Sequence, residues 1–160
     1  MATTYEKIAT TTLASTATSI TLGSIPATYT DLRLVIVASA ASGDVQVQLN
    51  GDTGSNYSRT YIYGTGSSAG SFEGANSSFV YLTGAGLSTT PKLYTVDLFS
   101  YAGSTYKTFL YEGNEDSNGS GQVLRGVALW SSTSAITSIY LYGATFAVGT
   151  TATLYGILKA

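Results

Sequence analysis

Hydrophobic and polar residues alternate one by one along most of this chain. Between Asp44 and Leu49, valines and a leucine take every second position and two glutamines lie between them. Such a period of two places the apolar residues on one face of a β-strand. From Asp31 to Val37 the second half is apolar on both sides, which predicts a strand that is buried on both faces.

The same alternation, carried by β-branched and aromatic residues, predicts strands along the whole chain. We expect strands at Glu6–Leu13, Thr18–Leu22, Asp31–Val37, Asp44–Leu49, Ser58–Tyr63, Ser78–Thr83, Leu93–Ser100, Lys107–Glu112, Gln122–Trp130, Ser138–Tyr142 and Thr151–Leu158. The Ala-Ala-Ser-Gly connection at 40–43 predicts a hairpin over 32–49. Gly- and Ser-rich segments at 64–77 and 113–121 predict long loops. No window shows an apolar stripe at helical spacing.

Many short strands in 160 residues predict a single all-β domain, residues 1–160, built as a sandwich or a barrel. Loops of uneven length favour an antiparallel β-sandwich of jelly-roll type over an up-and-down barrel with uniform hairpins. No sequence repeat of fixed period is present, which argues against a propeller. Residues 1–7 are a candidate extended N-terminal arm.

The composition removes most catalytic chemistry. The chain has no histidine and no cysteine, so neither a Ser-His-Asp triad nor a thiol nucleophile can form. No Ser-x-x-Lys stretch is present. Glu115 and Asp116 are adjacent in a polar loop, whereas glycosidase carboxylates face each other across a cleft. We therefore expect no enzyme activity, no catalytic residues and no cofactor.

Charge and hydropathy set further limits. The net charge is −2, and the seven lysines and arginines are scattered, which argues against nucleic-acid binding. The longest apolar run, residues 34–38, is too short to cross a bilayer, so we expect no membrane partner. The N-terminus lacks the basic and apolar segments of a signal peptide, and we expect synthesis in a cytoplasm.

One loop offers oxygen ligands. Asn50, Asp52 and Asn56 lie on a short glycine-containing segment, and such side chains are typical Ca²⁺ ligands. The twelve-residue calcium-loop pattern is absent, because no acidic residue closes the segment. The alternative is a turn in which these side chains cap backbone amides.

Aromatic residues form the other candidate site. Aromatic side chains and an arginine alternate on two of the expected strands, and a tryptophan ends a third. The candidate binding or interface residues are Tyr57, Arg59, Tyr61, Tyr63, Trp130, Tyr140 and Tyr142. Three interpretations stay open: a subunit interface, where Tyr, Trp and Arg are enriched, the protein core, or a surface on which sugar rings stack.

Three stretches resemble a pattern found in small structural proteins of tailed bacteriophages. They are YTDLRLVI at 29–36, VQVQLNGDTGSNYS at 45–58 and TLYGILK at 153–159. The group includes capsid decoration proteins as well as tail-fibre and receptor-binding modules. Its members are typically jelly-roll-like and often trimeric.

The resemblance implies a virion structural protein, made in the host cytoplasm. The chain has no heptads and no shaft-like repeat, which favours a decoration (cement) protein that binds and stabilises the outer shell. The implied partners are the major capsid protein and two further copies of the chain in a homotrimer. The alternative is a tail-fibre or receptor-binding module that binds a host-surface glycan through Tyr57, Tyr61, Trp130 and the loop at 50–56.

Overall fold

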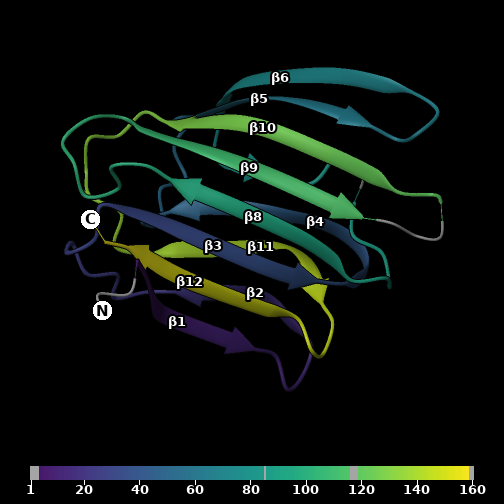
Figure 1. The fold of residues 1–160 in the computed structure, drawn as a ribbon, viewed down its shortest axis with the longest axis horizontal. Helices are drawn as coiled ribbons and strands as arrows, with labels where there is room; N and C mark the ends of the chain where they lie inside the picture. Colours follow the sequence, from purple (N-terminus) through teal and green to yellow (C-terminus); the bar gives the residue numbers. More distant parts are fainter. Residues whose placement is uncertain (1–3, 85, 116–118, 159–160) are drawn as a thin grey trace.

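The computed structural model describes residues 4–84, 86–115 and 119–158, and these residues form strands, turns and loops without any helix. Figure 1 shows the strands running side by side in layered sheets. The strands are β1 (Tyr5–Thr12), β2 (Ala17–Leu22), β3 (Asp31–Ala38), β4 (Ala40–Leu49), β5 (Tyr57–Gly64), β6 (Ala69–Ser77), β7 (Val80–Tyr81), β8 (Lys92–Leu98), β9 (Lys107–Glu115), β10 (Gln122–Trp130), β11 (Ile139–Phe146) and β12 (Thr151–Ile157).

The strands form two antiparallel sheets. The large sheet has eight strands in the order β1-β12-β3-β8-β9-β10-β5-β6, and the small sheet has four in the order β2-β11-β4-β7. The chain crosses from one sheet to the other at each of its first connections, since β1 and β3 lie in the large sheet and β2 and β4 in the small one. The expectation of an all-β, sandwich-like fold is confirmed.

The core lies between the two sheets. On β3, Leu32, Leu34 and Ile36 are at most 1% exposed, and they belong to one buried apolar cluster that includes Val47 and Leu141 of the small sheet. Burying a side chain of this size contributes about 1.5–3 kcal/mol. The alternation seen in the sequence is therefore the pattern of residues that face this core.

The expected burial of both faces of β3 is wrong. Val37 is 38% exposed, because the side of the large sheet that faces away from the small sheet has no layer over it. Only the Leu32 side of the strand enters the core. The apolar residues on the other side contribute to an exposed sheet face.

The expected hairpin over 32–49 is also wrong. β3 pairs with β12 and β8, whereas β4 pairs with β11 and β7 in the other sheet. Only Ser39 separates the two strands, and its neighbours Ala38 and Ala40 are 1% and 2% exposed. The chain bends here from one sheet into the other, so that the apolar faces of β3 and β4 oppose each other across the core.

Two expected loops contain strand. Residues 69–77, expected as loop, form β6, which pairs antiparallel with β5. β9 extends to Glu115, so the segment at 113–115 is strand as well. Its continuation, which includes Asp116, lies outside the described residues. β6 carries one large apolar residue, Phe72, and therefore lacks the alternation that identified the other strands.

The two ends of the large sheet differ in their cover. β1 pairs with β12, and Tyr5 to Lys7, expected as part of an arm, belong to this pairing. At the other end β6 has no buried residue, and Phe72 is 44% exposed although it lies opposite Tyr61 on the inward face. The β5–β6 hairpin thus extends beyond the small sheet, as Figure 1 shows for the edge strand β6.

Candidate functional site

The segment at 50–57, which we call the Asn50 loop, is tied to the chain before β11. The Asn50 side-chain amide donates to the carbonyl of Ala135 at 2.7 Å. Its oxygen accepts from the backbone N–H groups of Thr137 at 2.8 Å and Ser138 at 3.1 Å. Asn50 has a φ of 55°, a left-handed conformation that asparagine tolerates better than most residues. Both ends of its amide are therefore used within the protein.

Asp52 is surrounded by donors. One carboxylate oxygen accepts from the Trp130 indole N–H at 2.7 Å and from the Asn56 amide at 2.9 Å, and the other accepts from the Gly54 N–H at 2.8 Å. The indole hydrogen bond is the main reason why the pKa of Asp52 lies below its usual value, while burial acts in the opposite direction. Hydrogen-bond donors thus occupy the positions around the Asp52 carboxylate that a cation would take. This is the geometry of a turn in which side chains cap backbone amides.

A cluster of acidic ligands is also missing around this loop. In the described ranges, no three His, Cys, Asp or Glu side chains gather closely enough to hold a metal ion. Asn56 reaches Asp52 with its amide nitrogen, so its oxygen is directed elsewhere. Asn50, Asp52 and Asn56 act as structural groups that close a turn.

Tyr57 and Trp130 lie in the core beside this loop. They are 1% and 2% exposed and their rings stack at 6.3 Å. The Tyr57 hydroxyl accepts from the Leu49 N–H at 2.9 Å and donates to the Asp52 carbonyl at 3.2 Å. Burial raises the pKa of Tyr57 to about 12. Neither ring has a face open to a sugar or a protein partner.

A row of half-buried aromatic rings begins on the outward face of the small sheet. Tyr140 and Tyr142 of β11 stack at 5.1 Å, with 23° between their planes. Phe79 meets Tyr142 edge-on at 6.1 Å and Tyr81 edge-on at 4.7 Å. Tyr142 and Tyr81 share this face because both pair with Gln46 of β4.

Arg59 continues this row onto the β5–β6 hairpin. Its guanidinium carbon lies 4.5 Å from the ring centre of Tyr81, 5.0 Å from that of Phe72 and 5.9 Å from that of Tyr61. Tyr61 contacts Phe72 at 5.4 Å and Tyr63 at 6.2 Å. We call the connected set the aromatic tract; it consists of Arg59, Tyr61, Tyr63, Phe72, Phe79, Tyr81, Tyr140 and Tyr142.

The structure therefore divides the sequence candidates into two groups. The tract brings together Arg59, Tyr61, Tyr63, Tyr140 and Tyr142, while Tyr57 and Trp130 are in the core. Sequence reasoning missed three members, Phe72, Phe79 and Tyr81. Phe79 and Tyr81 alternate with buried Val80 and Leu82, and that alternation was the available signal. Phe72 had none, because it lies in a segment expected as loop.

Arg59 is unusual in its polar contacts. Its Nε is buried and has no hydrogen-bond partner within the described part of the chain, and the same holds for the hydroxyl of Tyr111. Burial raises the pKa of Tyr111, and the nearby charge of Arg59 acts against that increase. A pocket of about 180 Å³ lies beside Arg59, lined by Phe72, Phe79 and Tyr81 among others. Arg59 thus carries one unpaired donor and lines this pocket.

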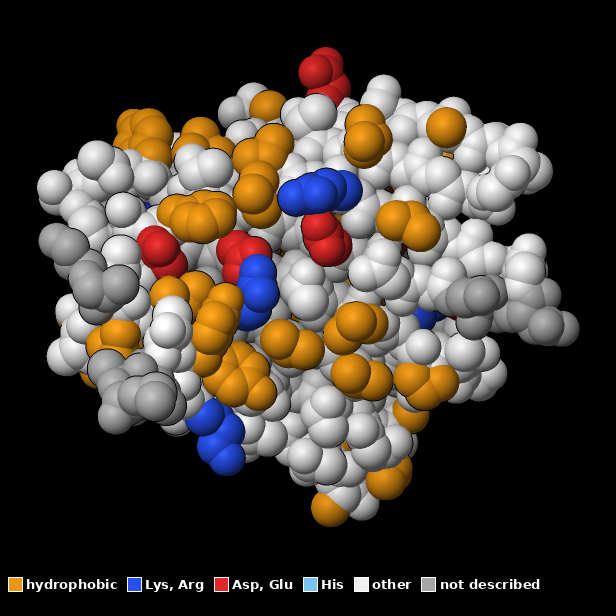
Figure 2. Space-filling model, in the orientation of Figure 1, with side chains coloured by type: hydrophobic (Ala, Val, Ile, Leu, Met, Phe, Trp, Pro, Cys, Tyr) orange, Lys and Arg blue, Asp and Glu red, His pale blue; other side chains and the backbone are white. Residues whose placement is uncertain are grey.

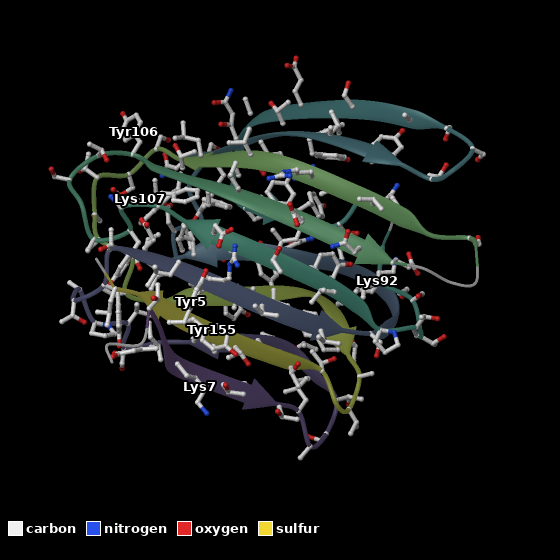
Figure 3. The ribbon with its side chains drawn as sticks, in the orientation of Figure 1. Tyr5, Lys7, Lys92, Tyr106, Lys107 and Tyr155 are labelled. Carbon is white, nitrogen blue, oxygen red and sulfur yellow. The ribbon has the colours of Figure 1, made fainter. Side chains whose placement is uncertain are left out.

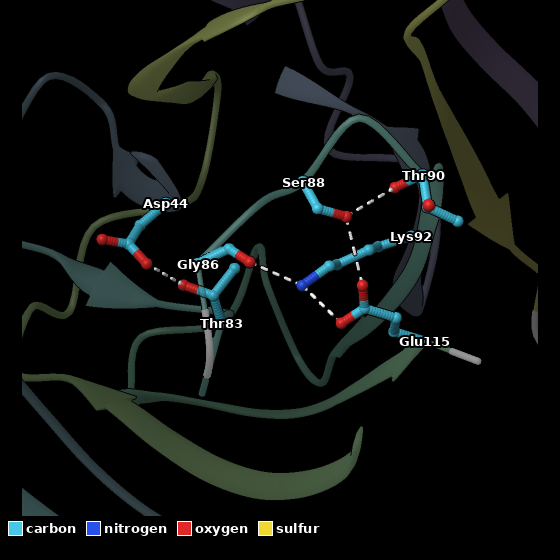
Figure 4. A network of polar contacts seen from close by, with 7 residues as sticks. All are labelled: Asp44, Thr83, Gly86, Ser88, Thr90, Lys92 and Glu115. Atoms are coloured by element: carbon cyan, nitrogen blue, oxygen red, sulfur yellow. Dashed lines mark hydrogen bonds and ion pairs between the residues drawn. The ribbon is translucent and has the colours of Figure 1, made fainter. Parts of the chain in front are cut away.

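A buried ion pair lies elsewhere, at one end of β8 and β9. Lys92 is 4% exposed, and its ammonium group contacts Glu115 at 2.6 Å and the carbonyl of Gly86 at 2.5 Å (Figure 4). Ser88 donates to the other Glu115 oxygen at 3.1 Å. Glu115 is therefore held in a structural pair. The adjacent Asp116 lies outside the described residues.

A second buried lysine lies at the opposite end of the sheet, as Figure 3 shows. Lys107 has no exposed surface and donates to the carbonyls of Gly103 at 2.6 Å and Thr105 at 2.5 Å. Burial lowers the pKa of its ammonium group. Its contacts close the loop before β9, which is a structural role.

The outward face of the large sheet mixes ion pairs with apolar patches, as Figure 2 shows. Arg33 pairs with Asp97 at 2.6 Å and Arg125 with Glu112 at 3.4 Å. Near the rim of this face Tyr5 and Tyr155 meet edge-on at 6.4 Å (Figure 3). These four charged side chains are neutralised in pairs within the chain.

Comparison with known proteins assigns no relative. No protein-family model, no curated protein and no solved structure matches this chain. A search of the described residues for a helix long and apolar enough to span a bilayer found none.

Proposed function

We propose that this chain is a non-catalytic structural protein of a tailed-bacteriophage particle. In this proposal it is a decoration protein that binds the outer shell of the capsid and stabilises it. The part of the aromatic tract on the small sheet, which consists of Phe79, Tyr81, Tyr140 and Tyr142, is the surface that docks on the shell protein. The jelly-roll assignment and the location in the virion, after synthesis in the host cytoplasm, belong to the same proposal.

The aromatic tract is the observation that carries this proposal. Tyrosine, phenylalanine and arginine are the residues that dominate the binding energy of protein interfaces. In the tract these side chains are half-buried or exposed and come from four strands or their ends, β5, β6, β7 and β11. Because they lie on a paired β scaffold, they lose little side-chain freedom when a partner binds.

The ring arrangement favours a protein partner. Tyr140 and Tyr142 stack on each other, and Arg59 covers one face of Tyr81. A sugar that stacks on an aromatic side chain needs an open ring face. The occupied ring faces are closed to a sugar, whereas a protein surface with mixed polar and apolar groups can contact ring edges and hydroxyl groups.

A homotrimer is the assembly that we propose. A trimer seated at a threefold or quasi-threefold position matches the local symmetry of a shell. The low charge of the chain, with 10% Asp, Glu, Lys and Arg, reduces the desolvation cost of burying its surface.

A second candidate is a tail-fibre or receptor-binding module that binds a host-surface glycan. It is favoured by Tyr142 and Tyr81, which share an outward face with the amide side chain of Gln46. Amides beside aromatic rings can bond sugar hydroxyls. Binding to a glycan array that disappears in Tyr142→Ala, with the fold intact, is the result that this candidate requires.

The copy number of the chain in purified particles decides between these proposals. Quantitative mass spectrometry against the major capsid protein gives the ratio. A ratio close to that of the capsid protein supports decoration of the shell. A few copies per particle would support the tail and glycan binding, and absence from the particle would contradict both.

A further inference from the structure

Most charged side chains in the described part of the chain have an ion pair or a hydrogen bond. Arg33, Arg125 and Lys92 have carboxylate partners, and Lys107 is held by backbone carbonyls. Within the described ranges, Arg59 and Glu73 have neither an ion pair nor a hydrogen bond from their side chains. Lys7 has none either, but it is exposed to water on the opposite edge strand.

Arg59 is the unpaired cation whose position carries a cost. Its Nε is buried, and a buried donor without an acceptor lowers the stability of the fold. The surrounding rings of Tyr61, Phe72 and Tyr81 stabilise its charge but accept no conventional hydrogen bond. The adjacent pocket of about 180 Å³ is smaller than a typical small-molecule site. Its size and charge suit one carboxylate side chain from a partner.

Glu73 is the matching anion, and it lies on the same hairpin. It pairs in register with Thr60, whereas Arg59 pairs with Gly74, so the two side chains point to opposite faces of the hairpin. Glu73 is exposed and borders a groove of about 510 Å³ on the outward face of the large sheet. Val127 and Leu129 give this groove an apolar floor.

Phe72 offers an apolar contact in addition to the charge pair. It is 44% exposed and lies next to Arg59, on the face opposite Glu73. A hairpin that presents a cation and an exposed ring on one face, and an anion and an apolar groove on the other, is complementary to a copy of itself. The free edge of β6 contains no proline or lysine, which are common protections against strand association.

We propose that Arg59 binds Glu73 of a second copy of this chain, with Phe72 seated in the second copy's groove beside Glu73. The contact is heterologous, because each copy offers one face of the hairpin to one neighbour and the other face to the next. Such contacts close into a ring when the rotation permits. The closed ring of three copies depends on the homotrimer that we propose as the functional assembly. The contact between Arg59 and Glu73 of two copies does not depend on it.

Sedimentation of the full chain tests the pair. Wild type is expected to associate at about 100 µM, and Arg59→Glu and Glu73→Arg are each expected to weaken association at least about 30-fold. An equal mixture of these two variants restores the pairwise association, because every contact between one variant and the other joins opposite charges, while a closed ring of three keeps one contact between like charges. Lys7→Glu changes the net charge as Arg59→Glu does and is expected to associate like wild type. If the charge-reversed variants do not fold, Arg59→Gln and Glu73→Gln test the loss of association in their place.

Three results would overturn the pair. They are a wild-type chain that stays monomeric at about 500 µM, single variants that associate like wild type, and a mixture that does not recover. Co-sedimentation of the same samples with capsid shells separates this inference from the proposed function. If the chain is monomeric and binds shells, and Arg59→Glu abolishes that binding, then a carboxylate of the shell protein occupies the pocket. A self-associating chain that does not bind shells would leave the pair intact and contradict the decoration role.

Discussion

The Asn50 loop and Arg59 are separated by one residue in the sequence but differ in how their polar groups are used. In the loop, Asp52 and Asn50 accept and donate hydrogen bonds at 2.7–3.1 Å, all within the protein. At Arg59, a buried Nε has no acceptor among the described residues. Both segments carry residue types that occur in binding sites. Only the Arg59 side chain keeps a hydrogen-bond donor that has no acceptor.

This difference separates structural from interaction residues. Removing a group whose hydrogen bonds are all made leaves its partners buried and unpaired, which lowers stability. Removing a group that has no partner leaves nothing unpaired. Substitutions in the loop should therefore destabilise the fold, and substitutions at Arg59 should affect association instead.

The largest effect is expected for Trp130→Ala. Its ring is 2% exposed and stacks on Tyr57, so its loss leaves a cavity and an Asp52 carboxylate without its indole donor. We expect the free energy of unfolding to fall by about 3–5 kcal/mol in urea titrations. A loss below about 1 kcal/mol would mean that this ring is not part of the core.

Asp52→Ala is expected to have a smaller effect than Trp130→Ala. It removes the acceptor of three hydrogen bonds and leaves the Trp130 indole N–H unpaired. The unfolding free energy should fall by about 1.5–3 kcal/mol, since bonds to a charged acceptor are stronger than neutral ones. Added Ca²⁺ should leave the wild-type melting temperature unchanged. An increase that disappears in Asp52→Ala would instead restore the calcium interpretation of this loop.

The pH dependence of stability gives a smaller, more specific signal. The pKa of Asp52 is lowered in the folded state, mainly by the Trp130 indole, so folding favours the ionised carboxylate. This contribution is fully present above the unfolded pKa of about 4 and is lost as the pH falls through the folded value. The difference in unfolding free energy between wild type and Asp52→Asn should narrow from pH 6 to pH 2.5. A constant difference over that range would contradict the assignment.

The smallest effect on stability is expected for Arg59→Met. Methionine keeps the apolar stem, contacts the same rings and removes the unpaired donor, so the unfolding free energy should change by less than about 1 kcal/mol. Lys92→Met is the matched variant, because it removes the ammonium group that pairs with Glu115, whose side chain is 12% exposed. It should cost about 3–5 kcal/mol. Equal losses in the two variants would remove the distinction between paired and unpaired cations.

Much of the fold followed from residue alternation, which reports the side on which each residue is buried. Val45, Val47 and Leu49 were expected inward and are at most 2% exposed. Alternation does not report which sheet a strand joins, and this is why β3 and β4 were wrongly paired. It also fails where few apolar residues are needed, as in β6, an uncovered edge strand.

The candidate site shows the same limit. Tyr57 and Tyr61 share one face of β5, yet Tyr57 is 1% exposed and Tyr61 is only partly buried. The difference arises from the small sheet, which covers the start of β5 and not the rest of the hairpin. No pattern within β5 contains this information, because the cover comes from residues distant in the sequence.

The most direct test of the docking role proposed for the aromatic tract is binding to purified capsid shells of a phage whose genome carries this sequence. Co-sedimentation would compare wild type with a variant that carries Tyr140→Ser and Tyr142→Ser. A variant with Tyr5→Ser and Tyr155→Ser is the matched control, since it removes another pair of contacting tyrosines. The account predicts at least a tenfold loss of affinity for the tract variant and none for the control. Equal binding by all three proteins would contradict it.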